Sequence, residues 1–392
     1  MRTWTRLAAW SRAVTAHHGG SFDVPRLEDL PDPAGRRVLV KANLDVPLAQ
    51  LEPLGRSRQL RQLGPTLRWL TEHQASVTIC GHQGTLGSPS DPDRYGKTVD
   101  ALSRLYPGVT VAPNLSAQEG TDADPSLLKT LAEGQDLFVN DDFQWCSLPL
   151  VSVIGPPTLL PSAAGRQLQA DLEMLAPLCV APERPLVVVL GSRDVLDRLH
   201  DLHALVLRAD AILVGGQMSR PFLEALGRQP PGEEPPSFIE ECRHAYGVAR
   251  AIRHNIQLPS DLVWEGPDGE ATIGGQEWVG GGSIGDIGPK TRLHYGEILR
   301  GASSILWAGS LGKVEDARFA EGTLTLGRVV STLPVRTVLG GDALVSLLTR
   351  HRLLPDTAGV VSATGSAVAL LKDGDLPGLT ALRQAPGATG PS

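Results

Sequence analysis

Short apolar runs alternate along the chain with longer stretches in which apolar and polar residues are mixed. The apolar runs fall at 37–41, 76–80, 109–112, 136–140, 186–190, 211–214, 304–308, 335–339 and 359–362. Nearly continuous apolar runs of this length are typical of parallel strands that are covered on both faces. We therefore predict an α/β protein in which strands and helices alternate.

Several of the intervening stretches have apolar residues at every third or fourth position, which is typical of amphipathic helices. Two such faces consist of Leu60, Leu63, Leu67 and Leu70, and of Val195, Leu199, Leu202 and Val206. Residues 159–176 show the same spacing, and Ser162 can cap a helix there. Because this segment lies between two groups of strands, we predict a long helix that joins two sheets.

The order of the elements predicts two doubly wound, Rossmann-like domains with parallel sheets, joined by a helix. The Gly-rich stretch 266–285 is expected to be irregular or to form a small hairpin. The predicted parts are an N-terminal extension (1–35), a first domain (36–158), the inter-domain helix (159–180), a second domain (181–374), and a C-terminal segment and tail (375–392).

The composition narrows the class of protein. Hydrophobic residues make up 41% of the 392 residues and charged residues 20%, as in an ordinary globular protein. The formal net charge of −7 and the lack of a basic stripe argue against a nucleic-acid binder. The four cysteines have neither metal-ligand nor disulfide spacing, and no apolar run approaches the length of a membrane span. We expect a cytoplasmic monomer with no membrane or nucleic-acid partner.

Polar side chains follow the strands of the first half directly. Lys41, Asn43 and Asp45 come at the end of the run 37–41, and His82 follows the run 76–80. Ligands of open parallel sheets bind beyond the carboxyl ends of the strands. These residues are therefore candidates for a substrate site in the first domain.

Glycines take the same place in the second half. They occur in GSR (191–193), which follows the run 186–190, in Gly215–Gly216, and in the turn GGD (340–342). Glycines at strand-to-helix junctions let backbone amides approach a phosphate, and the start of the helix favours its charge. Several such turns in one half predict a nucleotide site there, and the first domain would hold the second substrate.

Five segments then carry a resemblance to the phosphoglycerate kinase family. They are VNDDF (139–143), LPSAAG (160–165), LPSD (258–261), GDIGPKT (285–291) and DLPGLTAL (375–382). The resemblance implies two domains joined by a helix, with 3-phosphoglycerate on the first, Mg-ATP or Mg-ADP on the second, and a hinge closure between them. It also implies phosphoryl transfer between ATP and a carboxylate, which gives an acyl phosphate.

The chain departs from the family pattern on the acceptor side. Lys41 stands where the family has the arginine that stabilises the transferring group, while Asn43 and Asp45 take the places of an Asp and an Asn. His82 is kept. Other family arginines correspond here to Gln59, which has Arg58 beside it, and to Thr85, Ser116 and about Leu148. Charge-assisted hydrogen bonds contribute roughly 1.5–3 kcal/mol each, so losing three removes about 5–9 kcal/mol if they are additive. This argues against 3-phosphoglycerate as the acceptor.

The nucleotide side has changed as well. Asp194 replaces a family lysine, and Arg198 replaces the lysine that contacts the transferring group. By the resemblance, Glu315 would contact the ribose, and Asp342 would reach the magnesium of the Mg-nucleotide. The other expected nucleotide contacts are Gly191, Ser192, Arg193, Gly215, Gly216, Gly340 and Gly341.

A purely structural interpretation also stays open for these residues. The polar residues after the first strand would form a solvated edge with an internal ion pair, and His82 would be a buried, hydrogen-bonded histidine. Asp342 opens a predicted helix and would be its N-cap. Glu315 and Arg198 would be surface charges.

Three functions remain. The first is an ATP-dependent phosphotransferase that acts on a carboxylate other than 3-phosphoglycerate, with Lys41 and Arg198 as catalytic residues. Asn43, Asp45, Gln59 and His82 would bind the acceptor, and Asp45 suggests an acceptor with an amine or hydroxyl groups. The second is a non-catalytic relative with a binding or regulatory role. The third is an ordinary phosphoglycerate kinase.

Overall fold

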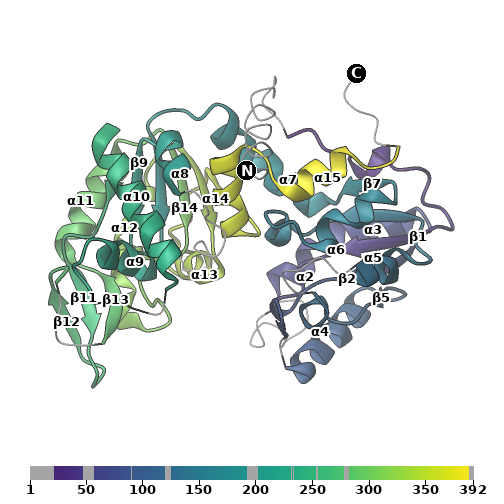
Figure 1. Ribbon diagram of the computed structural model, residues 1–392, viewed down its shortest axis with the longest axis horizontal. Coiled ribbons are helices and arrows are strands. Elements are labelled where there is room, and N and C mark those ends of the chain that lie inside the picture. Colours follow the sequence, from purple (N-terminus) through teal and green to yellow (C-terminus); the bar gives the residue numbers. More distant parts are fainter. Residues whose placement is uncertain are drawn as a thin grey trace, which may run out of the picture. The chain divides into compact units, whose positions relative to one another are not determined.

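The computed structural model describes residues 22–46, 57–89, 91–119, 125–191, 202–230, 232, 234–252, 255–277 and 282–387. These residues form two compact units. The first unit holds the described residues up to Glu173 together with those from Asp375 onward, and the second holds those from Met174 to Gly374. In each unit a parallel sheet is flanked by helices (Figure 1), as the alternating pattern predicted.

The first unit contains a parallel five-stranded sheet in the order β5-β2-β1-β6-β7. The strands are β5 (Thr110–Val111), β2 (Ser76–Cys80), β1 (Arg37–Lys41), β6 (Leu137–Asn140) and β7 (Ser162–Ala164). The helices of this unit are α2 (Arg58–Gln62), α3 (Gly64–Glu72), α4 (Pro92–Leu105), α5 (Pro125–Ala132), α6 (Val151–Ile154) and α15 (Pro377–Arg383). Leu60, Leu63, Leu67 and Leu70 are all buried in its core, but they do not form one helix: Leu60 is in α2, Leu67 and Leu70 are in α3, and Leu63 lies between the two.

The second unit contains a parallel six-stranded sheet in the order β10-β9-β8-β14-β15-β16. The strands are β10 (Ile256–Gln257), β9 (Ala211–Val214), β8 (Leu186–Leu190), β14 (Ser304–Ala308), β15 (Arg336–Gly340) and β16 (Ala358–Val360). The helices are α8 (Leu202–Arg208), α9 (Ser219–Ala225), α10 (Pro236–Ile252), α11 (Pro289–Arg300), α12 (Glu321–Val330), α13 (Asp342–Arg350) and α14 (Thr364–Asp373). Leu202 and Val206 are buried, whereas Val195 and Leu199 of the predicted helical face lie outside the described residues.

The Gly-rich stretch contributes to a separate antiparallel sheet in the order β12-β11-β13. Its strands are β11 (Leu262–Glu265), β12 (Ala271–Gly274) and β13 (Ser283–Ile287). β11 and β12 form the small hairpin that was one of two expectations for this stretch. Trp264 is buried against Leu223 of α9, which anchors the small sheet within the second unit.

The predicted helix at 159–180 begins later than expected. Residues Ser162–Ala164 form β7 beside β6, and α7 runs from Arg166 to Val180. Ser162 is not its cap, because its Oγ donates to the carbonyl of Leu160. Asp141 takes that role, since its Oδ1 accepts the amides of Gln167 and Leu168 at 2.8 and 3.1 Å.

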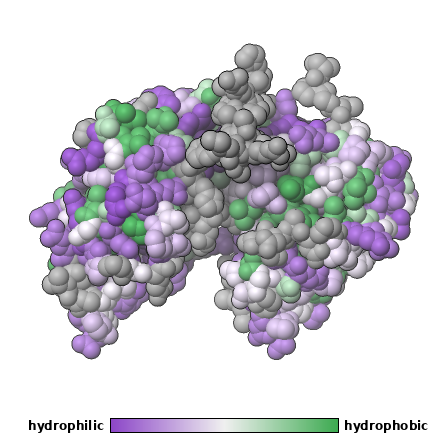
Figure 2. Space-filling view, viewed as in Figure 1, coloured by the Kyte–Doolittle hydropathy of each residue, from purple (hydrophilic) through white to green (hydrophobic). Residues whose placement is uncertain are grey.

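Three further features of the described residues concern the surface, the length of the helices and the cysteines. On the face in Figure 2, separate apolar areas lie among hydrophilic residues. None of the helices in the described ranges combines the length and the apolar character needed to cross a bilayer. All four cysteines are buried and free.

Candidate functional site

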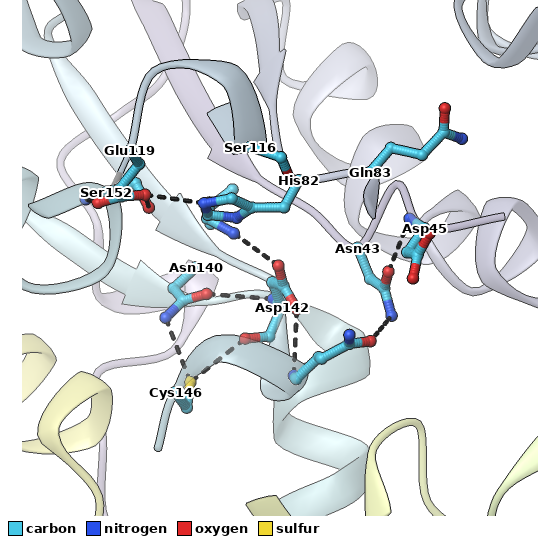
Figure 3. A network of polar contacts seen from close by, with 12 residues as sticks. Asn43, Asp45, His82, Gln83, Ser116, Glu119, Asn140, Asp142, Cys146 and Ser152 are labelled. Atoms are coloured by element: carbon cyan, nitrogen blue, oxygen red, sulfur yellow. Dashed lines mark hydrogen bonds and ion pairs between the residues drawn. The ribbon is translucent and has the colours of Figure 1, made fainter. Parts of the chain in front are cut away.

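The carboxyl ends of β1, β2 and β6 lie side by side in the first unit. Lys41 is in register with Cys80 of β2 and with Asn140 of β6. The residues that follow these strands therefore meet at one edge of the sheet, as the sequence predicted (Figure 3). We refer to this edge as the first edge.

Lys41 forms a fully buried ion pair at the first edge. Its Nζ lies 2.6 Å from Oδ2 of Asp142, and both side chains are 0% exposed. Oδ1 of Asp142 accepts the amide of Gln144 at 3.1 Å, so the carboxylate is held from two sides. A pair that has been removed from water depends on such added hydrogen bonds. In this arrangement the ammonium of Lys41 is not available to a ligand, and its predicted catalytic role would require the pair to open.

Asn43 and Asp45 are half-buried beside this pair. Asn43 Nδ2 donates to Gln144 Oε1 at 2.7 Å, and Asn43 Oδ1 accepts the amide of Asp45 at 3.0 Å. Asp45 Oδ1 accepts from Arg94 Nη2 at 2.9 Å and from the amide of Gly84 at 3.3 Å. The negative charge of Asp45 is thus compensated within the unit, by an arginine that the sequence did not single out.

His82 is also buried and hydrogen-bonded. Its Nε2 lies 2.8 Å from Oε2 of Glu119, and Glu119 also accepts the amide and the Oγ of Ser152 at 2.8 and 2.6 Å. Burial and the nearby charge of Lys41 lower the pKa of His82. Burial acts to raise the pKa of Glu119, but the hydrogen bonds from His82 and Ser152 outweigh it and leave that pKa below its usual range. Figure 3 shows Glu119 and Ser152 on one side of the His82 ring.

The remaining acceptor-side positions carry no charge. Gln59 is half-buried at the start of α2, where its Oε1 accepts from Ser57 Oγ at 3.1 Å. Thr85 is exposed, and Ser116 is fully buried. Lys41 and Arg94 are the cations that the described contacts place at the first edge, and each is paired with a carboxylate. Among the described contacts, the first edge therefore presents amide and hydroxyl groups, and its cations Lys41 and Arg94 are both paired.

Sequence reasoning missed four members of this network: Glu119, Ser152, Gln144 and Arg94. Asp142 belongs to the NDD segment that follows β6, so its position was visible in the sequence, but its pairing with Lys41 was not. Glu119 is far from His82 in the chain and follows a two-residue strand, so no spacing pointed to it.

The carboxyl ends of the strands in the second unit form a second edge. Ala308 is in register with Gly340 of β15 and with Leu190 of β8, and Leu190 is in register with Val214 of β9. The glycine turns after these strands are therefore neighbours. At two of these positions the packing of the backbone itself requires glycine, whether or not a ligand binds. A Cβ on Gly191 would lie 2.1 Å from the carbonyl oxygen of Ser310, and one on Gly216 would lie 2.8 Å from the carbonyl oxygen of Gly191.

Two helices begin at the second edge without a side-chain cap. The N-caps are Gly341 for α13 and Ala363 for α14, and neither makes a side-chain capping bond. The suggestion that Asp342 is the N-cap is thus wrong: Asp342 is the first helical residue, and the N-cap is Gly341, whose φ of +106° favours glycine. Uncapped amides at a helix start can bind a phosphate.

The described residues of the second edge fit a Mg-nucleotide. Asp342 and Glu315 are both exposed, and Asp342 lies in the first turn of α13, which starts without a side-chain cap. One carboxylate could meet a hydrated magnesium ion and the other a ribose hydroxyl. Ser192, Arg193 and Arg198, which were predicted to contact nucleotide, lie outside the described residues. Within the described parts of the chain, no cluster of three or more His, Cys, Asp or Glu residues could hold a metal ion by itself.

Comparisons with known proteins agree with this architecture. A family model described as phosphoglycerate kinase matches residues 109–374. A phosphoglycerate kinase of Thermus thermophilus is 33% identical, with 90% of this chain and 98% of that protein covered. One of Salinispora arenicola is 31% identical, with 92% and 100% covered. The crystal structure of phosphoglycerate kinase from Pyrococcus horikoshii OT3 has a TM-score of 0.72 at 23% identity and covers 92% of this chain and 98% of that chain.

Proposed function

Because the chain belongs to the phosphoglycerate kinase family, we propose that it is a phosphotransferase whose acceptor is a carboxylate other than 3-phosphoglycerate. The observation that carries this proposal is the composition of the first edge. Lys41 and Arg94, the cations that the described contacts place there, are bound to Asp142 and Asp45, so neither offers a phosphate dianion a free positive charge. Without a free positive charge, binding would remove the hydration of the dianion and supply little interaction energy to compensate for that loss.

The reaction would be an in-line transfer between two oxygens. A carboxylate oxygen of the acceptor attacks the γ-phosphorus of ATP, the bond from that phosphorus to the β–γ bridging oxygen breaks, and ADP leaves. Catalysis of this kind depends on positioning and on charge stabilisation. The products are an acyl phosphate and ADP.

The residues of the second edge would hold the nucleotide. The amides that begin α13 and α14 would bind phosphate oxygens, Asp342 would orient the hydrated magnesium ion, and Glu315 would bind the ribose. Magnesium supplies charge neutralisation between the β- and γ-phosphates when it is bound. Arg198 would add positive charge at the transferring group.

The acceptor would be held by the uncharged groups of the first edge. Asn43 and Gln59 are half-buried and offer amide donors and acceptors. These groups suit a small acid with hydroxyl or amino substituents better than one with a phosphate. His82 would take part in this acceptor site as a neutral imidazole, because burial lowers its pKa.

A second candidate is a non-catalytic relative that keeps the scaffold for binding or regulation. One observation favours it: Lys41 and His82, two of the predicted acceptor-side residues, are fully buried and bound to Asp142 and Glu119. Such internal pairs compensate their polar groups without a ligand.

Nucleotide binding separates the two candidates. We expect Mg-ADP and Mg-ATP, titrated calorimetrically into the full chain, to bind with micromolar affinity. Incubation with Mg-ATP, hydroxylamine and a panel of carboxylic acids should then trap a hydroxamate from a non-phosphorylated acid and none from 3-phosphoglycerate. A hydroxamate from 3-phosphoglycerate would instead identify an ordinary phosphoglycerate kinase. Absence of nucleotide binding at millimolar concentration would leave the non-catalytic candidate.

A further inference from the structure

A pocket of about 270 Å³ lies beside the second edge, next to the turn that follows β9. Gln217, which directly follows Gly215 and Gly216, lines it. The loop after β14 closes another side, where the amide of Lys313 donates to the carbonyl of Gly285 in β13. The residues that line the pocket include Gln217, Arg220, Glu234, Ser283, Ile284 and Lys313. A nucleotide whose phosphates lie at the helix starts of this edge could place its base here.

The lining of this pocket is polar. Ile284 is its buried apolar residue, whereas the other side chains carry charges, an amide or a hydroxyl. The Lys313 charge is already compensated, because its Nζ forms an ion pair with Glu265 and donates to Ser283 Oγ at 2.6 Å. A base in this pocket would therefore be selected by hydrogen bonds along its edge more than by apolar contact.

Arg220 is the cation of this pocket that can offer its guanidinium to a ligand. It is half-buried, and within the described residues its guanidinium has neither a hydrogen bond nor an ion pair. It lies against the backbone of Gly232, since a Cβ built on that glycine would be 2.8 Å from Arg220 Nε. A half-buried guanidinium without an internal partner favours a ligand that offers two acceptor atoms side by side.

Guanine offers this pair of acceptors, and adenine does not. O6 and N7 of guanine accept a bidentate arginine, whereas adenine has an amino group at the position of O6. The N1 and N2 donors of guanine also need an acceptor, and Glu234 supplies a carboxylate in the same pocket. We propose that the pocket reads the nucleobase through Arg220 and Glu234 and that the protein binds guanine nucleotides more tightly than adenine nucleotides. This inference rests on the proposed nucleotide-binding function.

The test is a calorimetric comparison of Mg-GDP, Mg-IDP and Mg-ADP on the full chain. We expect GDP to bind at least ten-fold more tightly than ADP, with IDP, which lacks the N2 amino group, in between. Arg220→Gln should bring the GDP-to-ADP ratio close to one. Glu234→Gln should lower GDP affinity to that of IDP and leave ADP unchanged. Arg300→Gln, at an exposed arginine at the end of α11, is the matched control and should keep the wild-type ratio.

The outcomes separate this inference from the proposed function. Equal or tighter binding of ADP overturns the base preference and leaves the kinase proposal standing. A GDP preference that survives in both Arg220→Gln and Glu234→Gln overturns the assignment of these residues. Binding of none of the three nucleotides overturns the inference and the proposed nucleotide site together.

Discussion

The carboxyl ends of the two large sheets differ in how their polar groups are satisfied. At the first edge, the side chains bind one another: Lys41 binds Asp142, His82 binds Glu119, and Asp45 binds Arg94. At the second edge, the carboxylates of Asp342 and Glu315 are exposed, and two helices start without side-chain caps.

The difference shows that the same strand-end position can serve two purposes. Buried polar pairs make the local structure rigid, and each paired member becomes costly to remove. Exposed carboxylates and helix starts without side-chain caps contribute less to stability than buried pairs do, and a ligand can reach them. Substitutions at the first edge should therefore change stability most, and substitutions at the second edge should change binding most.

The largest effect is expected at the buried ion pair. Lys41→Met leaves the carboxylate of Asp142 buried without its partner and should lower the free energy of unfolding by about 3–5 kcal/mol, measured by urea denaturation. The matched control is Arg37→Met at the other end of β1, where the pair with Asp136 is exposed and little change is expected.

The double variant Lys41→Met/Asp142→Leu tests the same explanation from the other side. It removes both charges and should regain much of the lost stability. If Lys41→Met lowers the free energy of unfolding no more than Arg37→Met does, the buried pair of Lys41 and Asp142 does not contribute to stability in the way that its burial implies.

Two buried carboxyl groups, Glu119 and Asp286, should make the free energy of unfolding change with pH in opposite directions. The pKa of Glu119 is lowered from 4.5, so its stabilising contribution is present above that pH and is lost as the pH falls. Burial raises the pKa of Asp286, in β13 of the second unit, to about 7, although the amide of Gly322 donates to it. Because the native state then holds a proton that the unfolded state releases above 3.8, this group lowers stability as the pH rises from about 4 to 7.

Urea denaturation across this pH range checks both signs. The stability of the wild type relative to Asp286→Asn should fall by roughly 2–4 kcal/mol between pH 4 and 7. The stability of the wild type relative to Glu119→Gln should instead rise with pH below 4.5 and stay level above it. Curves that run parallel for both pairs would show that neither carboxyl titrates in this way.

The smallest effect concerns the second edge. Asp342→Asn should weaken binding of the Mg-nucleotide about ten-fold, equivalent to about 1.4 kcal/mol, because one carboxylate near the metal is lost. The free energy of unfolding should stay the same, since the side chain is exposed. Asp356→Asn, at another exposed aspartate of this unit, is the control for binding. Equal affinities in the two variants would remove Asp342 from the nucleotide site.

The strands that the sequence predicted most precisely are those with continuous apolar runs. β1, β2, β8, β9 and β14 have the predicted bounds. β7 was missed because Ser162, Ala163 and Ala164 have no strand preference of their own and are extended only through pairing with β6. That pairing is a tertiary effect, so a helical pattern in the following residues dominated the prediction.

The sequence predicted where the polar residues of the first edge lie, but it did not predict which of them pair with one another. Strand order brings Lys41 beside Asn140, and hence beside Asp142 two residues later, but nothing local reveals that β1 and β6 are neighbours. The same holds for His82 and Glu119. The structural interpretation of Lys41 and His82, an internal ion pair and a buried histidine, describes their observed contacts, and their roles toward substrate stay predictions.

The residues of α15 bring the chain back to the first unit after it has formed the second. α15 packs against α6 and β7, the amide of Gly378 donates to the carbonyl of Cys146 at 3.0 Å, and Leu379 and Leu382 are 0% exposed. During synthesis, the first unit therefore cannot complete its core until residues 377–383 have left the ribosome. A stop codon before Asp375 would leave this unit, whose other residues precede Met174, without part of its packing.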